Sequence, residues 1–381
     1  MSRRRGVLGC LLPLSGPFAL FGEEALNGIQ LGMDIFGGPG KGPVRELVIM
    51  DTQGQPEIAA SAVEELADRE KVVGIIGPLS SKTASAVAEK AQEMGVPVIA
   101  LTQKEGITKG RGMVFRNFLT PTRQVDRILQ AAVDEMGLRR FGILYPDNPY
   151  GRFYMSLFWR ELNKKGGVVT AVESYDPDKT DFADEIRKMT GLYYPRPPSL
   201  VVRLRAESPM EEEENELTPK EPAPIVDFDA VFIPDTYQRV AMIAPQLVYH
   251  DVLDVQLLGT SLWQSQKLIE LAGEYVQGAI FPSGFYGDYD DPALKAFVES
   301  YRANFESEPG ILAATAYDTM RFLQKVMAQR QVRTRKDLRE AILWSDGFHG
   351  VTGKIFFDID GEVERKPILL TVRGRRMRLY R

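Results

Sequence analysis

The sequence predicts an α/β fold of two lobes, each a doubly wound parallel sheet with helices on both faces. Three observations predict it. Short apolar, β-branched runs alternate with amphipathic helical stretches, and this alternation breaks near residues 118–122 and then restarts. The runs are apolar throughout, as in parallel strands that helices cover on both faces. At a prior of about 150 residues per domain, a chain of 381 residues holds two domains.

In the first half, four apolar runs are expected as strands and three amphipathic stretches as helices. The expected strands are Val7–Leu14, Glu46–Met50, Val72–Ile76 and Pro97–Leu101. The expected helices are Glu23–Phe36, Glu57–Arg69 and Ser81–Met94. Apolar residues recur at helical spacing in the first two helices, which places them on one face of each helix.

After residue 122 the same alternation continues, and the chain ends on a hairpin. The expected strands are Phe141–Tyr145, Val168–Tyr175, Ala230–Ile233, Gln256–Leu258 and Ala279–Pro282. The expected helices are Arg152–Lys164, Phe182–Thr190, Arg239–His250, Pro292–Phe305 and Leu312–Gln329. Lys354–Phe357 and Ile368–Tyr380 are expected as antiparallel strands, with a turn at Gly374.

Residues 193–226 differ in composition from the rest of the chain. Seven prolines and seven glutamates fall between residues 195 and 224. Such a segment buries too little apolar surface to offset the entropy lost on ordering it. We expect a flexible, acidic, proline-rich insertion in the second lobe, and a partner-binding acidic segment is the alternative.

The composition excludes several classes of function. Lys and Arg number 47 and Asp and Glu number 52, so the net charge is −5 and offers no basic field for nucleic acid. Cys10 is the only cysteine, and His250 and His349 are the only histidines. These counts argue against a disulfide framework, a metal site and a nucleophile beside a base. We therefore expect neither an enzyme nor a cofactor, and an activity based on paired carboxylates or Tyr stays open as a third alternative.

Two short motifs resemble a signal peptide and a phosphate-binding loop but lack features that those signals require. The apolar run Val7–Cys10 behind Arg3–Arg5 is too short for the core of a signal peptide, and no run approaches the about 20 apolar residues that span a bilayer. The glycines of Gly37–Pro43 close a helix instead of opening one. They indicate a turn and not a phosphate-binding loop.

Polar residues follow two neighbouring strands of the first lobe, at the sheet edge where open α/β sheets bind ligands. Ser80, Ser81 and Thr83 begin the helix after Val72–Ile76. Thr102 and Gln103 follow the next strand. Hydroxyls and free N–H groups at a helix start favour an anion. Helix capping by Ser80 or Ser81 is the alternative interpretation.

The second lobe carries aromatic and hydroxyl groups at its strand ends. Tyr150 lies in Asp147–Gly151, which follows a strand, and Asp235, Thr236 and Tyr237 follow Ala230–Ile233. Such groups suit a wall over a small molecule, although the same residue types are common in turns. The arginines between 373 and 381 are expected to form a solvated face.

Leu11–Gly22 reads Leu-Leu-Pro-Leu-Ser-Gly-Pro-Phe-Ala-Leu-Phe-Gly, and Asn27–Gly32 follows it. These segments closely resemble type 1 periplasmic binding proteins of the leucine/isoleucine/valine-binding family of ABC importers. Asp51–Gln53, Val72–Pro78 and Tyr145–Gly151 match in the same order. The resemblance implies two Rossmann-like lobes, three crossover strands and a ligand cleft between the lobes. The N-terminal lobe would be 1–119 plus about 286–345, and the C-terminal lobe 122–285 plus about 350–381.

The resemblance also implies the ligand contacts. The segment Ser80–Thr83 would hold a ligand carboxylate, and Thr102 and Gln103 would complete that clamp. Tyr150 and the loop Asp235–Tyr237 would cover the ligand from the second lobe. Amino-acid binders of the family carry an acid that pairs with the ligand ammonium. The matching loop here offers Ser261 in that place, and Asp235 stays open as a substitute.

A second resemblance lies in the later half of the chain. Phe228–Asp235, Ile243–Leu247 and Leu258–Ser261 are similar to penicillin-binding-protein activator lipoproteins, which share the fold and are thought to contact a peptidoglycan synthase. Two hypotheses follow. The first is an extracytoplasmic solute-binding protein of an ABC importer, which binds a small amino-acid-like or carboxylate ligand between two hinged lobes and has the transporter permease as its partner. The alternative is a synthase activator.

Both resemblances imply a periplasmic or extracytoplasmic location. The export signal is expected to be missing from this chain. A lipid anchor on the full-length protein stays open. No cofactor, metal or nucleic acid is implied as a partner.

Overall fold

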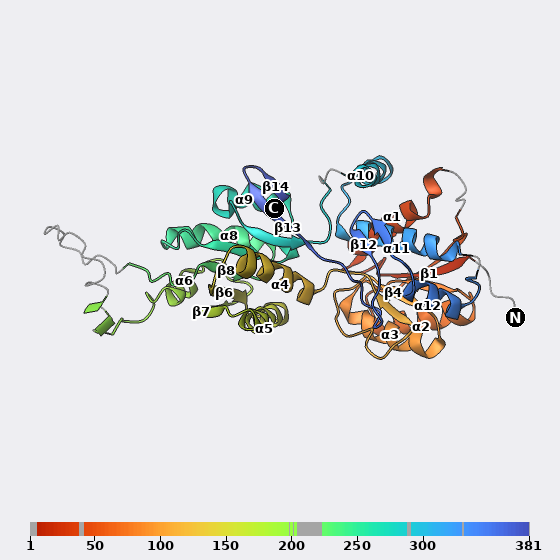
Figure 1. Cartoon of the computed structure of the whole chain (residues 1–381), viewed down its shortest axis with the longest axis horizontal. Coiled ribbons are helices and arrows are strands. Elements are labelled where there is room, and N and C mark those ends of the chain that lie inside the picture. Colours follow the sequence, from red (N-terminus) through yellow and green to blue (C-terminus); the bar gives the residue numbers. More distant parts are fainter. Residues whose placement is uncertain are drawn as a thin grey trace. The chain divides into compact units, whose positions relative to one another are not determined.

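The computed structural model describes residues 6–37, 42–197, 199–200, 202–203, 223–287, 291–329 and 331–380. The chain divides into two compact units (Figure 1). The first unit comprises residues 1–120 and 284–367, and the second comprises residues 121–283 and 368–381. The chain therefore passes from one unit to the other at three points, after residues 120, 283 and 367.

The sheet of the first unit has five parallel strands in the order β2-β1-β3-β4-β5. The strands are β1 (Val7–Leu12), β2 (Glu46–Asp51), β3 (Gly74–Ile76), β4 (Val98–Ala100) and β5 (Val114–Arg116). Because all five run in one direction, their carboxyl ends share one edge of the sheet. A small hairpin of β11 (Phe348–Gly350) and β12 (Gly353–Ile355) lies in the same unit.

Helices cover both faces of this sheet (Figure 1). Leu8, Cys10 and Leu12 of β1 pack against the face formed by α1 (Ala19–Gly32), α11 (Ile311–Met327) and α12 (Arg335–Leu343). Val7 and Leu11 point the other way, toward α2 (Pro56–Asp68) and α3 (Ser81–Met94). Period-2 alternation along a strand buried on both sides gives this division.

Glycine lets α1 and α11 pack with their backbones almost touching. A Cβ on Gly28 would lie 2.1 Å from the carbonyl oxygen of Ala313, so no larger residue fits there without separating the helices. α10 (Pro292–Phe305) begins at Asp291, whose carboxylate accepts from two backbone N–H groups of its first turn. Its aromatic face joins a separate core cluster with α11.

The sheet of the second unit has seven strands in the order β14-β13-β10-β9-β8-β6-β7. The five parallel strands are β6 (Arg140–Pro146), β7 (Val168–Tyr175), β8 (Ala230–Ile233), β9 (Gln256–Gly259) and β10 (Ile280–Ser283). The last two, β13 (Ile368–Arg373) and β14 (Arg376–Leu379), are antiparallel, with Gly374 in the turn. The expected hairpin at the end of the chain is confirmed.

Helices again lie on both faces (Figure 1). α4 (Pro121–Leu129), continued by a wider turn at Gln130–Glu135, and α5 (Pro149–Lys164) share a core with β6, β8 and β9. α6 (Ala183–Met189) lies against β7, and α8 (Tyr237–Tyr249) lies against α9 (Gln266–Ala272). Short 3₁₀ turns occur at Ile35–Gly37, Ser261–Trp263 and Gly273–Val276.

Residues 350–367 belong to the first unit, which corrects their predicted assignment to the second lobe. Buried contacts hold them there. The Asp318 carboxylate of α11 accepts from the backbone N–H groups of Val351 (2.8 Å) and Thr352 (2.7 Å). Glu362 pairs with Arg116 at the end of β5. These contacts join residues far apart in the sequence, so local patterns do not reveal them.

Five of the described helices and strands were not predicted, namely β5, β11, α4, α9 and α12. The break expected at residues 118–122 is the start of α4, where Pro121 occupies the first helical position that suits proline. Most of the acidic insertion predicted at 193–226 lies outside the described residues, so its flexibility stays a prediction. In the part of the chain that the structure describes, no helix has the length and apolar character to cross a membrane.

Candidate functional site

Ser81 and Thr102 come together at the carboxyl edge of the first unit's sheet. Their hydroxyl oxygens lie 3.4 Å apart, although 21 positions separate them in sequence. The pairing of β3 beside β4 explains this, because Ser81 opens the helix after β3 and Thr102 follows β4. Ser81 is exposed, whereas Thr102 is buried beneath it and also accepts from the Lys104 N–H at 3.3 Å. Thr102 therefore lies within hydrogen-bond distance of the exposed hydroxyl, and either oxygen can be the donor.

Ser80 and Thr83 stabilise the start of α3. The Ser80 hydroxyl accepts from the Lys82 N–H at 3.2 Å, and the buried Thr83 hydroxyl donates to the Ser80 carbonyl at 3.1 Å. This is the capping role that the sequence left open. The Lys82 N–H is thereby occupied, as is the Thr83 N–H, which donates to the Ser80 carbonyl at 3.2 Å, and the exposed Ser81 hydroxyl stays at the start of the helix.

Gln103 lies in the loop after β4, and a buried arginine holds that loop. Arg116 donates from Nη1 to the Gln103 carbonyl at 3.1 Å and from Nε to Glu362 at 2.8 Å. Thr108 donates to the other oxygen of Glu362 at 2.7 Å. Sequence reasoning missed Arg116, since its partner Glu362 is 246 positions away. The only signal was a cation inside an apolar run.

Asp51, at the end of β2, organises the loop between β1 and α1. Its Oδ1 accepts from the N–H groups of Leu14 (2.8 Å) and Gln53 (2.8 Å), and its Oδ2 accepts from the Ser15 hydroxyl at 2.5 Å. Partial burial favours the protonated acid, but these hydrogen bonds outweigh it and hold the pKa of Asp51 below its ordinary value.

Replacing Asp51 with Asn should lower the free energy of unfolding at neutral pH and flatten its acid dependence. A carboxyl whose pKa is lowered by folding stabilises the protein above the ordinary value of 3.8. That contribution disappears as the pH falls through the folded-state pKa. Urea unfolding of the wild type and the Asp51→Asn protein from neutral to acid pH measures the difference. An equal difference at all pH values would contradict the assignment, and Asp68→Asn, on α2, controls for charge.

Exposed apolar side chains follow β1 at the same sheet edge. Phe18, Leu20 and Phe21 are 42%, 80% and 50% exposed. Adjacent exposed apolar residues mark surfaces that contact another molecule. In the sequence these residues belong to the family pattern, and they were not predicted as site residues.

In the second unit, Tyr150 and Thr260 are hydrogen bonded. The Tyr150 hydroxyl donates to Thr260 Oγ1 at 3.0 Å, and its ring centroid lies 4.7 Å from that of Tyr154. Burial raises the pKa of the Tyr150 phenol, against the opposing effect of its hydrogen bonds. Tyr150, in α5, is thus a neutral donor, and its acceptor lies in the loop after β9. Thr260, which sequence reasoning missed as a site residue, is its partner.

Asp235 is buried and already occupied by protein donors. Its Oδ2 accepts from the Tyr175 hydroxyl at 2.7 Å, and its Oδ1 accepts from the Thr236 N–H at 2.6 Å. Burial, with the nearby Asp235 charge, raises the pKa of the Tyr175 phenol. Thr236 and Tyr237 begin α8 and are half-buried. Asp235 therefore orders the start of α8, whatever else it contacts.

Ser261 lies in the loop between β9 and α9, which a tryptophan supports from below. The Ser261 N–H donates to Gln124 Oε1 of α4 at 2.9 Å. Trp263 is fully buried, donates from Nε1 to the Ile233 carbonyl at 3.2 Å, and fills the space that a side chain at Gly259 would need. Ser261 itself is half-buried.

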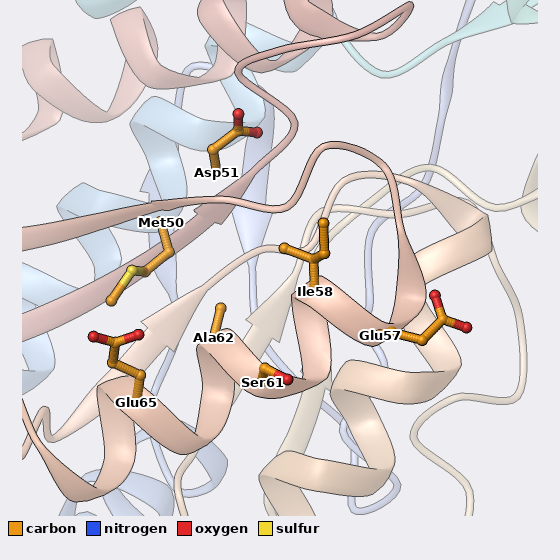
Figure 2. Close-up of a pocket in the computed structure, with 7 residues that line it drawn as sticks. All are labelled: Met50, Asp51, Glu57, Ile58, Ser61, Ala62 and Glu65. Atoms are coloured by element: carbon orange, nitrogen blue, oxygen red, sulfur yellow. The ribbon is translucent and has the colours of Figure 1, made fainter.

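A hollow of about 420 Å³ lies elsewhere in the first unit, between β2 and α2 (Figure 2). Met50, Ile58, Ala62 and Glu65 are among its lining residues. Figure 2 shows the Asp51 carboxylate pointing away from α2. The hollow contains none of the predicted ligand residues.

Among the described residues, no group of three or more His, Cys, Asp or Glu side chains could hold a metal ion. Cys10 is buried in β1, and burial raises the pKa of its thiol to about 12. That thiol is a core side chain and not a nucleophile.

A family described as periplasmic binding protein matches residues 7–191 and 227–376 of the chain. Leu/Ile/Val-binding protein homolog 3 of Brucella melitensis is 23% identical over 186 residues, which are 48% of this chain and 50% of that protein. The chain thus spans about half the length of the curated relatives it matches.

Two of the solved structures that share the fold are similar to this chain over almost their whole length. A putative branched-chain amino acid ABC transporter protein from Rhodospirillum rubrum has a TM-score of 0.79, at 22% identity and with both chains fully covered. The branched-chain amino acid transporter substrate-binding protein LivJ of Streptococcus pneumoniae, in complex with isoleucine, has a TM-score of 0.69, at 22% identity over 99% of each chain.

Proposed function

The chain belongs to the periplasmic binding protein family, and from this premise we propose that it binds a small carboxylate, in the first place an aliphatic amino acid. It does so as the extracytoplasmic solute-binding protein of an ABC importer, with the permease as its partner. The observation that carries the proposal is the exposed Ser81 hydroxyl at the start of α3, 3.4 Å from the Thr102 hydroxyl.

The start of α3 suits a carboxylate for two physical reasons. The helix dipole favours negative charge at the start of α3, where the Lys82 and Thr83 N–H groups already donate to Ser80. Ser81 adds an exposed hydroxyl donor at that helix start, and Thr102 and Gln103 complete the proposed clamp from the end of β4. Ser80 and Thr83 stabilise the helix start through hydrogen bonds within the protein.

The rest of the ligand is matched by apolar and aromatic groups. Phe18, Leu20 and Phe21 offer exposed apolar surface at the same sheet edge as Ser81, which favours an aliphatic or aromatic side chain on the ligand. From the second unit, Tyr150, Asp235, Thr236, Tyr237 and Ser261 are the proposed contacts.

The ammonium of an amino acid is the open part of the recognition. Burying it without a carboxylate would cost several kcal/mol, on the order of the penalties for unpaired buried charges. Among the described residues, each of the two Asp235 oxygens has one donor, so each keeps a lone pair. It is the proposed partner of the ammonium. A binder of simple carboxylates needs no such partner.

A ligand panel tests the proposal. Thermal unfolding and calorimetry are run with L-leucine, L-isoleucine, L-valine, benzoate and L-leucinamide. We expect carboxylates to raise the melting temperature, by the equivalent of about 2.7 kcal/mol at a hundredfold excess over Kd. L-leucinamide, which lacks the carboxylate, should have no effect. A protein that responds to none of them would contradict the proposal and favour the synthase activator.

A further inference from the structure

The loop that follows β9, Thr260–Gln264, is hydrogen bonded to segments at two of the points where the chain passes between units. Gln124, on α4, is the fourth residue after the first passage, and its Oε1 accepts from the Ser261 N–H at 2.9 Å. Ser283, the last residue before the second passage, donates to Gln264 Oε1 at 2.5 Å. Both ends of the loop are therefore hydrogen bonded to passage segments, by which we mean the residues next to a point where the chain passes between units.

The same loop carries Ser261, a proposed ligand contact, and Thr260, which is hydrogen bonded to the proposed contact Tyr150. Thr260 is fully buried and accepts from the Tyr150 hydroxyl and, at 3.4 Å, from the Leu262 N–H. A shift of the loop would move the oxygen that orients Tyr150. The contacts run from Gln124 through Ser261 and Thr260 to Tyr150.

Glutamine is not the residue type that would stabilise the fold most at position 124. Its side chain is fully buried, and its Nε2 has no hydrogen-bond partner among the described residues. An unsatisfied buried donor is costly, and an apolar residue of the same length would avoid that cost. The oxygen of the side chain is therefore the useful atom, and within the described part of the chain its partner is the Ser261 N–H.

We propose that Gln124 and Ser283 are positioning residues that hold the Thr260–Gln264 loop in the geometry that Tyr150 needs for ligand binding. Neither residue is required to touch the ligand. The inference rests on the proposed function for its ligand, but the positioning itself is a property of the free protein. The Thr260–Gln264 loop then links the proposed ligand contact Tyr150 to the segments at two of the passages between units.

The experiment compares Gln124→Met, Ser283→Ala and the wild type. Methionine keeps the length of the side chain and removes the acceptor. We expect amide hydrogen exchange at Ser261 and Leu262 to speed up about three- to tenfold in Gln124→Met, the range that one net hydrogen bond gives. We expect the Kd for L-leucine to rise by a similar factor. Ser283→Ala should raise the Kd in the same direction.

Gln246→Met is the matched control. Gln246 also ties segments of the second unit together through both ends of its amide, accepting from the Phe182 N–H and donating to the Thr180 carbonyl, away from the loop. The Gln246→Met change should lower the free energy of unfolding and leave amide hydrogen exchange at Ser261 and the Kd for L-leucine unchanged.

Unchanged exchange in Gln124→Met would overturn the proposal, as would faster exchange with an unchanged Kd. If the wild type ignores L-leucine, the proposed function fails, and the exchange measurement still decides whether Gln124 positions the loop.

Discussion

The Ser81→Ala protein is expected to bind L-leucine about 10- to 100-fold more weakly than the wild type, because a hydrogen bond to a charged group contributes about 1.5–3 kcal/mol. Ser81 is the exposed hydroxyl at the start of α3, and alanine there keeps the helix. The fold should be unaffected, since Ser80 supplies the cap. Calorimetric titration measures the Kd, and thermal unfolding without ligand checks stability.

A double-mutant cycle with Thr102→Val tests how the pair works. If Thr102 acts by orienting Ser81, the loss from both changes together should be smaller than the sum of the two single losses. The matched control is Thr83→Val, in the same helix. The Thr83 hydroxyl serves the backbone of Ser80, so this change should cost stability and leave the Kd within about threefold. An equal loss of affinity in Thr83→Val would refute the assignment of Ser81.

Replacing Trp263 with alanine should lower the free energy of unfolding by about 3–5 kcal/mol, the range for deleting a buried aromatic. Trp263 is fully buried, lies 6.1 Å from Phe281 between ring centroids, and donates to the Ile233 carbonyl. Its ring occupies the space beside Gly259. Because it supports the loop of Thr260 and Ser261 from below, ligand affinity should fall as well.

Urea unfolding of Trp263→Ala measures this loss, and Trp344→Ala is the matched control. Trp344 is 74% exposed, so its removal should change the free energy of unfolding by less than about 0.5 kcal/mol. Trp263→Phe should recover part of the stability, since it restores much of the volume and none of the hydrogen bond. A loss below about 1 kcal/mol in Trp263→Ala would show that the loop does not depend on the ring.

Local patterns predicted the elements whose apolar periodicity is strong. The helix Ser81–Met94 and the strand Val168–Tyr175 were predicted to the residue. α4 was missed because its first turn, Pro121–Gln124, is polar and begins with proline, which resembles a loop. α12 was missed in a stretch rich in arginine, where only Leu338, Ile342 and Leu343 are buried.

For the candidate site, the sequence identified residues at strand ends, since parallel strands bring those ends to one edge. It could not separate the exposed Ser81 from Thr83, which lies two positions away and is fully buried. It could not find Gln124 or Arg116 either. Their partners are 137 and 246 positions distant, and only packing brings them together.

The amino-acid order by itself determined the α/β class, the direction of the strands and the edge of each sheet that carries polar groups, because these follow from side-chain period and local capping. The tertiary structure alone decided which hydroxyl is exposed, which unit holds residues 350–367 and what supports the loop of Ser261. Those outcomes depend on buried hydrogen bonds between distant segments, and such bonds form only after the hydrophobic cores have fixed where each segment lies.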